Sequence, residues 1–187
     1  MNRNTSKPVV AILATHGFEE IELVSPANAL AHAGIHTVIV SPAESQVRAS
    51  NGPHQAEWFD VDHTLKSASV DDFDALLIPG GLVHMDEMRR ESSAVDFVRR
   101  FARAGKPVFA IGYAPQILIS ADVVRGRRLT ASRSIRTDLA NAGAEIIENS
   151  VVTDGNLVTC RNPDDFARFN AEIVSMVRAD AREPVAA

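Results

Sequence analysis

The chain has 187 residues, of which 45% are hydrophobic and 23% are charged, and its formal net charge is −5 at pH 7. These values fit one globular domain that buries a sizeable core. Basic residues form no long block, so we expect neither a nucleic-acid partner nor a membrane partner. The single cysteine, Cys160, excludes an internal disulfide and a cysteine-rich metal site.

The first residues loosely resemble a signal peptide, because the polar stretch 1–7 precedes the apolar stretch 8–14. The apolar part is short and runs directly into His16-Gly17-Phe18, so we interpret it as a ragged N-terminus followed by a first strand. We expect one domain over residues 8–178, flexible termini at 1–7 and 179–187, and a cytoplasmic protein.

Strands and helices are predicted to alternate along the chain. Continuous apolar runs predict buried strands at residues 9–14, 37–40, 75–78 and 108–111. Helical periodicity predicts helices at 19–33, 92–104, 135–142 and 163–177. This order is typical of an α/β fold with a mostly parallel sheet, in which sites lie at the carboxyl ends of the strands.

Details of several elements are also predicted. Ile21, Val24 and Ala31 are expected on the apolar face of the first helix, with Gly34 as its end. Asn51-Gly52 predicts a hairpin turn within residues 41–70, with Trp58-Phe59 as an apolar anchor, and Asp154-Gly155 predicts a second hairpin over 151–159. Ser134 is expected to cap the helix at 135–142.

The stretch from Pro107 to Ala121 has the shape of a nucleophile elbow. The apolar run 108–111 is a strand, Gly112 is a sharp turn, and Pro115 lies in the first turn of a helix, where its missing N–H costs nothing. The residue at the tip of an elbow is normally a nucleophile. Glycine supplies no atom for attack, and it also relieves the backbone strain of the turn.

Four motifs in register resemble the DJ-1/PfpI superfamily, over roughly residues 8–177. They are Ala14-Thr-His-Gly-Phe-Glu-Glu-Ile-Glu22, Asp74-Ala-Leu-Leu-Ile-Pro-Gly-Gly81, Ala110-Ile-Gly-Tyr-Ala-Pro-Gln116 and Asp154-Gly-Asn-Leu-Val-Thr-Cys-Arg161. The similarity is greatest to the PfpI-like branch, whose members are labelled intracellular protease, amidase, deglycase or stress protein. It implies a flavodoxin-like three-layer sandwich, like that of class I glutamine amidotransferases, and usually a dimer.

The resemblance also implies a site. Glu22 matches the glutamate that bonds the family's elbow cysteine, and Gly80-Gly81 matches the turn whose N–H groups form an oxyanion pocket. The family elbow commonly reads Ala-Ile-Cys-His-Gly-Pro. Here Gly112, Tyr113 and Ala114 replace the cysteine, histidine and glycine.

The remaining candidate residues each have a functional and a structural interpretation. Glu22 is either a pocket carboxyl with a raised pKa or a helix-dipole acid. His16 and His84 follow strands at the expected edge and either form a metal or acid/base cluster with Glu22 or are solvated loop residues, and of these we expect no metal. Cys160 is either a relocated nucleophile or a buried apolar residue. Arg161 is either a pocket residue or the partner of Asp164 or Asp165, and Tyr113 either fills the pocket or offers its phenol.

The sequence therefore predicts a DJ-1/PfpI-like protein without the nucleophilic cysteine. We expect a catalytically degenerate binding or stress-response module, in effect a pseudoenzyme, which forms a homodimer or a higher homo-oligomer, binds a small molecule and uses no cofactor. A first alternative is a hydrolase or lyase that uses Glu22 with the Gly80-Gly81 pocket. A second alternative is a scaffold subunit that pairs with an active relative.

Overall fold

The computed structural model describes residues 7–180, so the predicted flexible termini lie outside the described residues except for Lys7, Ala179 and Asp180. A central sheet of seven strands has the order β10-β11-β7-β6-β1-β2-β5. Its strands are β1 (Val9–Leu13), β2 (His36–Ser41), β5 (His63–Thr64), β6 (Ala75–Ile78), β7 (Val108–Ile111), β10 (Val151–Asp154) and β11 (Leu157–Cys160). All neighbours pair in parallel except β10 and β11. The predicted mostly parallel sheet is confirmed.

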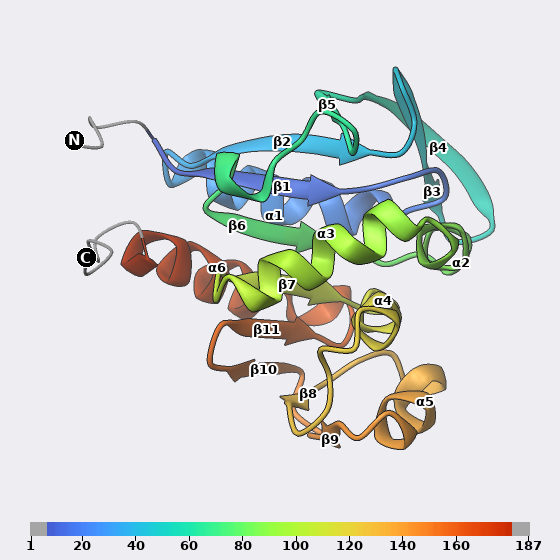
Figure 1. The fold of residues 1–187 in the computed structure, drawn as a ribbon, viewed down its shortest axis with the longest axis vertical. Coiled ribbons are helices and arrows are strands. Elements are labelled where there is room, and N and C mark those ends of the chain that lie inside the picture. The colour runs from blue at the N-terminus through green and yellow to red at the C-terminus, as the bar shows by residue number, and fades with distance from the viewer. Residues whose placement is uncertain (1–6, 181–187) are drawn as a thin grey trace.

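Helices cover both faces of this sheet, which makes the predicted flavodoxin-like sandwich (Figure 1). The helices are α1 (Glu20–His32), α2 (Leu82–Arg90), α3 (Ser92–Arg103), α4 (Pro115–Ser120), α5 (Arg136–Asn141) and α6 (Phe166–Asp180), with short 3₁₀ turns at Val70–Asp72, Arg133–Ile135 and Pro163–Asp165. Helices α1 and α6 lie on one face, and α2, α3 and α4 lie on the other.

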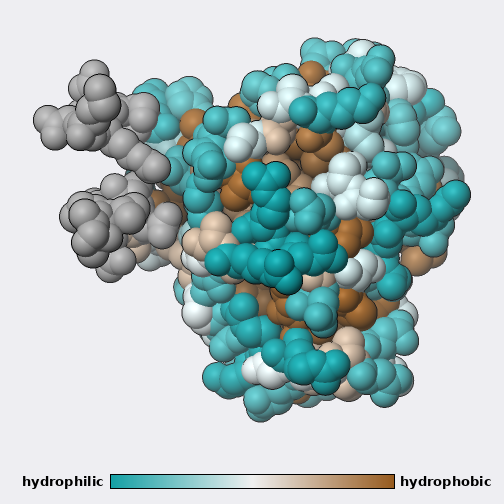
Figure 2. All heavy atoms as spheres, in the orientation of Figure 1, coloured by the Kyte–Doolittle hydropathy of each residue, from teal (hydrophilic) through white to brown (hydrophobic). Residues whose placement is uncertain are grey.

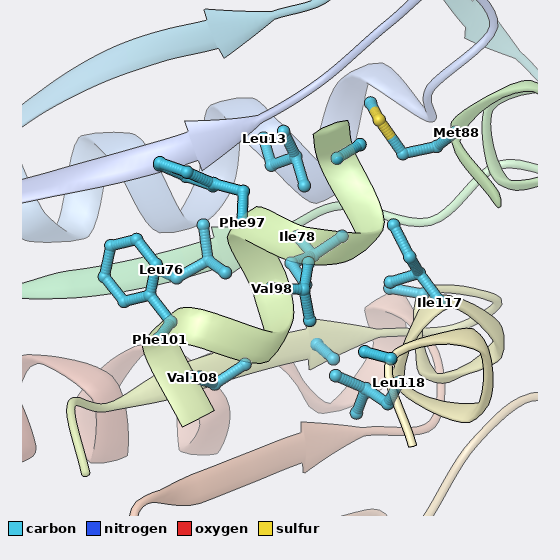
Figure 3. Packing of buried hydrophobic residues seen from close by; sticks show 14 of the residues in the cluster. Leu13, Leu76, Ile78, Met88, Phe97, Val98, Phe101, Val108, Ile117 and Leu118 are labelled. Carbon is cyan, nitrogen blue, oxygen red and sulfur yellow. The ribbon is translucent and has the colours of Figure 1, made fainter. Parts of the chain in front are cut away.

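The two faces of the sheet supply two separate hydrophobic cores. Successive residues of β1 alternate between them: Ala11 and Leu13 join the core under α3, whereas Val10 and Ile12 join the core under α1 and α6. Figure 3 shows the first core, in which Phe97, Val98 and Phe101 of α3 point toward Leu76, Ile78 and Val108 of the strands. Burial on both faces explains why the parallel strands are continuously apolar.

Two smaller sheets lie beside the main one. The hairpin of β3 (Gln46–Asn51) and β4 (His54–Asp60) turns at Gly52-Pro53, one residue after the predicted Asn51-Gly52, and a register shift interrupts it between Arg48 and Ser50. Strands β8 (Arg128–Leu129) and β9 (Glu145–Ile146) form a short parallel pair. The arrowheads of β1, β6 and β7 point toward the edge where α2, α4 and the β3–β4 hairpin gather (Figure 1).

Some details of the sequence-based expectations are wrong. In α1 the buried residues are Glu22, Leu23, Pro26 and Leu30, whereas Ile21 is half exposed. Ala31 is exposed as well, but Val24 packs against the core under α1 and α6, so the predicted face is only partly correct. Ser134 makes no helix cap, since its hydroxyl pairs with Tyr113.

Helix α2 was absent from the expected elements. Its sequence has charged residues through its second half and shows no clear apolar period. The side of the helix that faces the protein is formed by His84, Met85 and Met88, which are buried.

Polar residues cover most of the face seen in Figure 2, with apolar residues visible between them. Within residues 7–180, no helix combines the length and the apolar character that a membrane span requires.

Candidate functional site

The predicted elbow is present between β7 and α4. Gly112 lies at φ +58°, in the left-handed region that residues with a Cβ adopt only at a cost. Its N–H donates to the Cys160 carbonyl at 2.9 Å, and its own carbonyl accepts from Ser132 N at 3.0 Å. Pro115 occupies the first turn of α4, as expected. The backbone of the elbow is therefore fixed on both sides of the tip.

The tip of the elbow points at Glu22. A Cβ placed on Gly112 would lie 3.0 Å from Oε1 and 3.3 Å from Oε2 of that carboxyl. The Cβ of an elbow nucleophile would therefore contact the Glu22 carboxyl group. In this chain the residue at that position is glycine and has no side chain.

Glu22 is held in this place by burial and by one strong hydrogen bond. It is 5% exposed, and the N–H of Gly80 donates to its Oε2 at 2.6 Å. Desolvation by burial raises the pKa of the Glu22 carboxyl from 4.5 to about 7, the charge of Glu19 adds to this, and the Gly80 hydrogen bond opposes it. Near neutral pH the carboxyl therefore exists in both protonation states.

The Gly80-Gly81 turn brings backbone N–H groups to the same point. A Cβ on Gly80 would lie 2.5 Å from Glu22 Oε2 and 3.0 Å from Tyr113 N, so only glycine fits there. The Gly80 carbonyl is fixed by Glu19 N at 3.2 Å and by His84 Nδ1 at 3.2 Å. Within residues 7–180, no acceptor takes the N–H of Gly81 or of Tyr113. Unpaired N–H groups near a carboxyl are the components of an oxyanion pocket.

His84 belongs to this cluster, but not as a loop residue. It lies on α2, is fully buried and contacts the ring of Phe18 edge to face. Burial lowers the pKa of His84 from 6.5 to about 4, so the ring is neutral at physiological pH. Its Nδ1 then donates to the Gly80 carbonyl, and in the described structure Nε2 has no hydrogen-bond partner.

Tyr113 and Ala114 face away from the carboxyl and toward the α3 side. Tyr113 packs against the core under α3, and its hydroxyl accepts from Ser134 Oγ at 3.3 Å. Ala114 is fully buried in the same core. Of the two roles expected for Tyr113, the structure shows the phenol in a hydrogen bond.

Cys160 ends β11 next to the elbow but is buried completely. Burial raises the pKa of its thiol from 9.0 to about 12, and its Sγ donates to the Asn162 carbonyl at 3.2 Å. A protonated, buried thiol is a poor nucleophile. The interpretation of Cys160 as a small buried residue fits these contacts.

Arg161 and His16 are not part of the cluster around Glu22. The Arg161 guanidinium lies 3.6 Å from the Asp165 carboxylate and is partly exposed, which matches its ion-pair interpretation. His16 is exposed, and its Nδ1 accepts from Arg48 N at 3.0 Å, so it faces the β3–β4 hairpin. No group of three or more His, Cys, Asp or Glu residues suited to a metal occurs within residues 7–180.

A second concave region lies beside the elbow, and its main residues were missed. Arg48 and Trp58 line a groove with His16, Leu82 and Val83. Trp58 is 53% exposed and is no core anchor; Phe59 packs against the core instead. Because successive side chains of a strand point to opposite faces, the sequence of β4 could have shown that Trp58 and Phe59 lie on different faces. Nothing in the sequence indicates that α2 approaches this hairpin.

The comparisons with known proteins agree with this geometry. Residues 8–176 match the model of the DJ-1/PfpI family. An uncharacterized protein of Staphylococcus saprophyticus is 44% identical over 171 residues, which cover 90% of this chain and 96% of the relative. An uncharacterized protein of Staphylococcus aureus is 43% identical over 172 residues, with 90% and 98% covered.

Solved structures share the fold. A two-domain protein of Anabaena variabilis, with DJ-1/ThiJ/PfpI-like and ferritin-like domains, superimposes with a TM-score of 0.85 at 35% identity, over 95% of this chain and 50% of that one. DJ-1beta of Drosophila melanogaster gives 0.81 at 27% identity, over 95% and 97%. The family model, the relatives and the fold agree, and the chain belongs to the DJ-1/PfpI family.

Proposed function

We propose that this chain is a DJ-1/PfpI protein without thiol chemistry, which acts as a binding or stress-response module. The observation that supports this most is the elbow tip: Gly112 keeps the left-handed backbone, and its missing side chain would begin 3.0 Å from Glu22 Oε1. The surroundings of a nucleophile are present, and the attacking atom is not.

Cys160 does not replace that atom. It is the only cysteine in the chain, it is fully buried, and its raised pKa keeps the thiol protonated at neutral pH. A thiol pathway therefore has no reactive sulfur within the described structure.

The test is turnover of reactive carbonyls. The protein is incubated with methylglyoxal and with a glycated peptide, and lactate and released peptide are followed by proton NMR against a heat-denatured control. We expect no turnover above that control. Gly112→Cys is the positive arm, because it restores a thiol beside Glu22. Turnover by the unmodified chain above that control would contradict the proposal.

A second candidate function is a hydrolase or lyase that uses Glu22 as a general base. Its support is the raised pKa of about 7, which suits a base near neutral pH, together with the unpaired N–H groups of Gly81 and Tyr113. In this mechanism the carboxylate removes a proton from water or from carbon, and the amides stabilise the oxyanion. Activity toward amide and ester libraries that disappears in Glu22→Gln would favour this candidate over the first.

We also retain the homodimer and the scaffold alternative as proposals that rest on the family resemblance, and the cytoplasmic location as a proposal that rests on the sequence. Sedimentation equilibrium measures the mass of the assembly, and a mass of one chain at all concentrations would contradict the dimer. Affinity capture from the native cell that returns only this chain would argue against a scaffold for an active relative.

A further inference from the structure

A groove of about 550 Å³ opens beside the elbow, on the same edge of the sheet. Its walls come from the loop after β1, the β3–β4 hairpin and the first turn of α2, which lie together in Figure 1. Neither Glu22, Gly80, Gly112 nor Tyr113 lines it, so it is distinct from the elbow site. A cavity of this size accommodates a small organic molecule.

One wall of the groove is apolar and open to solvent. Trp58, Leu82 and Val83 are 53%, 63% and 57% exposed, and they are three of the four large apolar side chains that are exposed within residues 7–180. Large apolar side chains gathered in one concave place are typical of a binding surface. Here they form a surface for the apolar body of a ligand.

Arg48 places a fixed positive charge against this wall. Its guanidinium carbon lies 5.3 Å from the centre of the Trp58 ring. Its Nε donates to the Ala56 carbonyl at 3.1 Å, and its Nη1 donates to Gln55 Oε1. In the described part of the chain, no carboxylate forms an ion pair with Arg48 and no acceptor takes Nη2. The side chain is therefore held in place while both N–H groups of Nη2 stay free.

Further donors line the same groove. Because His16 Nδ1 accepts from Arg48 N at 3.0 Å, the proton of the neutral ring is on Nε2. The His16 ring contacts Trp58 edge to face at 6.0 Å. Gln55 uses its carbonyl oxygen for Arg48, which leaves its amide N–H groups available. The one carboxylate in the lining, Glu19, accepts from Gly52 N at 3.2 Å and from Ser50 Oγ at 3.5 Å.

We propose that this groove binds a small monocarboxylate with a planar apolar body. The carboxylate pairs with Arg48 and accepts from His16, and the apolar body lies against Trp58, Leu82 and Val83. A single negative charge is favoured because one uncompensated arginine lies in the lining and the Glu19 carboxylate repels a second charge. The proposal goes beyond the function proposed for the elbow and does not depend on chemistry at Gly112.

The test uses the only tryptophan of the chain as its own reporter. Phenylacetate is titrated while Trp58 fluorescence and saturation-transfer NMR of the probe are followed. Phenylacetamide tests the need for the charge, and phenyl phosphate tests a dianion. We expect saturable binding of phenylacetate, with phenylacetamide weaker by at least about tenfold, the effect of losing a hydrogen bond to a charged group. Phenyl phosphate should also bind more weakly than phenylacetate, because the Glu19 carboxylate in the lining repels its second charge.

Variants separate the groove from the elbow. Arg48→Gln should weaken phenylacetate at least about tenfold, whereas Arg168→Gln, at an exposed arginine outside the groove, should change nothing. Leu82→Ala tests the apolar wall at a residue too exposed to destabilise the fold. Glu22→Gln should leave the affinity for phenylacetate unchanged. A failure of the groove proposal can therefore be distinguished from a failure of the function proposed for the elbow.

Three results would overturn the proposal. The first is no saturable response to phenylacetate by either method. The second is equal affinity for phenylacetate and phenylacetamide. The third is burial of Trp58 by a second copy of the chain, seen as a fluorescence change that follows the sedimentation-measured mass and prevents probe binding.

Discussion

The elbow site and the groove lie on the same edge of the sheet but are made of different parts of the chain. The elbow consists of backbone N–H groups and one buried carboxyl, which are fixed by hydrogen bonds and by the close approach of the backbone at Gly80, where no larger residue fits. The groove consists of exposed side chains on a hairpin and on the start of α2. Substitutions at the elbow should therefore change the free energy of unfolding, whereas substitutions in the groove should change binding.

The largest expected effect is the pH dependence of stability at Glu22. Between pH 4.5 and about 7, the folded chain retains a proton on Glu22 that the unfolded chain releases. Glu22 therefore contributes a fall of about 3 kcal/mol in the unfolding free energy as pH rises through this window, and the buried His84 opposes it in the unmodified chain. Glu22→Gln abolishes this fall while it keeps an acceptor for Gly80 N. Urea denaturation followed by circular dichroism from pH 4 to pH 8 measures it.

His84 produces the opposite slope and serves as the paired variant. Below pH 6.5 the unfolded chain binds a proton on His84, but the folded chain does so only near pH 4. The contribution of His84 to the unfolding free energy therefore falls as pH drops from 6.5 to 4, also by about 3 kcal/mol. The two slopes oppose one another in the unmodified chain. In His84→Gln the unfolding free energy should fall as pH rises, because only Glu22 then contributes. In Glu22→Gln it should rise with pH, because only His84 then contributes. If either variant differed from the unmodified chain by the same amount at every pH, the claim that both charges are buried would be refuted.

The next effect is backbone strain at the elbow. Gly112→Ala should lower the unfolding free energy by about 1–3 kcal/mol, because φ is +58°. Gly155→Ala is the matched control, since Gly155 has φ +55° and its nearest atom to a new Cβ is 3.9 Å away. We expect Gly112→Ala to cost more than the control, because its Cβ also meets Glu22 at 3.0 Å. Equal losses would mean that the carboxyl moves aside freely.

The smallest effect on stability should come from the groove. Trp58→Phe and Leu82→Ala change side chains that are 53% and 63% exposed, so the unfolding free energy should stay within about 0.5 kcal/mol of the unmodified chain. Urea denaturation at pH 7 checks this. A loss of several times that size would show that the groove side chains support the fold, and it would remove the contrast with the elbow.

The sequence predicted most of the fold because its strands are buried on both faces and end at glycines. The runs 75–78 and 108–111 and the turn at Gly34 were placed correctly for this reason. Helix α2 was missed because its short polar sequence has no apolar period of its own. The buried face of α1 was predicted only in part, because it contains Glu22, which a hydrophobicity pattern assigns to solvent.

The candidate site also has a part that could be predicted from the sequence and a part that could not. Glu22, Gly80-Gly81 and Gly112 come together because they follow strands that are neighbours in the sheet. Strand order placed the two glycine turns at one edge, whereas the place of Glu22 beside them was expected only from the family resemblance. Arg161 and His16 also follow strand ends, but their side chains turn to Asp165 and to the hairpin. Side-chain direction at a strand end depends on the packed loops, and the sequence pattern does not specify it.

The most direct measurement of the central claim is alkylation of the native protein. The intact chain is treated with iodoacetamide at pH 7.5 and its mass is measured, with a sample in urea as the reference for full reaction. Because Cys160 is buried and its pKa is raised to about 12, we predict no adduct in the folded chain and one adduct in urea. Gly112→Cys should gain one adduct while folded, mapped to position 112. Native alkylation of Cys160 at the rate seen in urea would contradict the claim that this family site operates without a thiol.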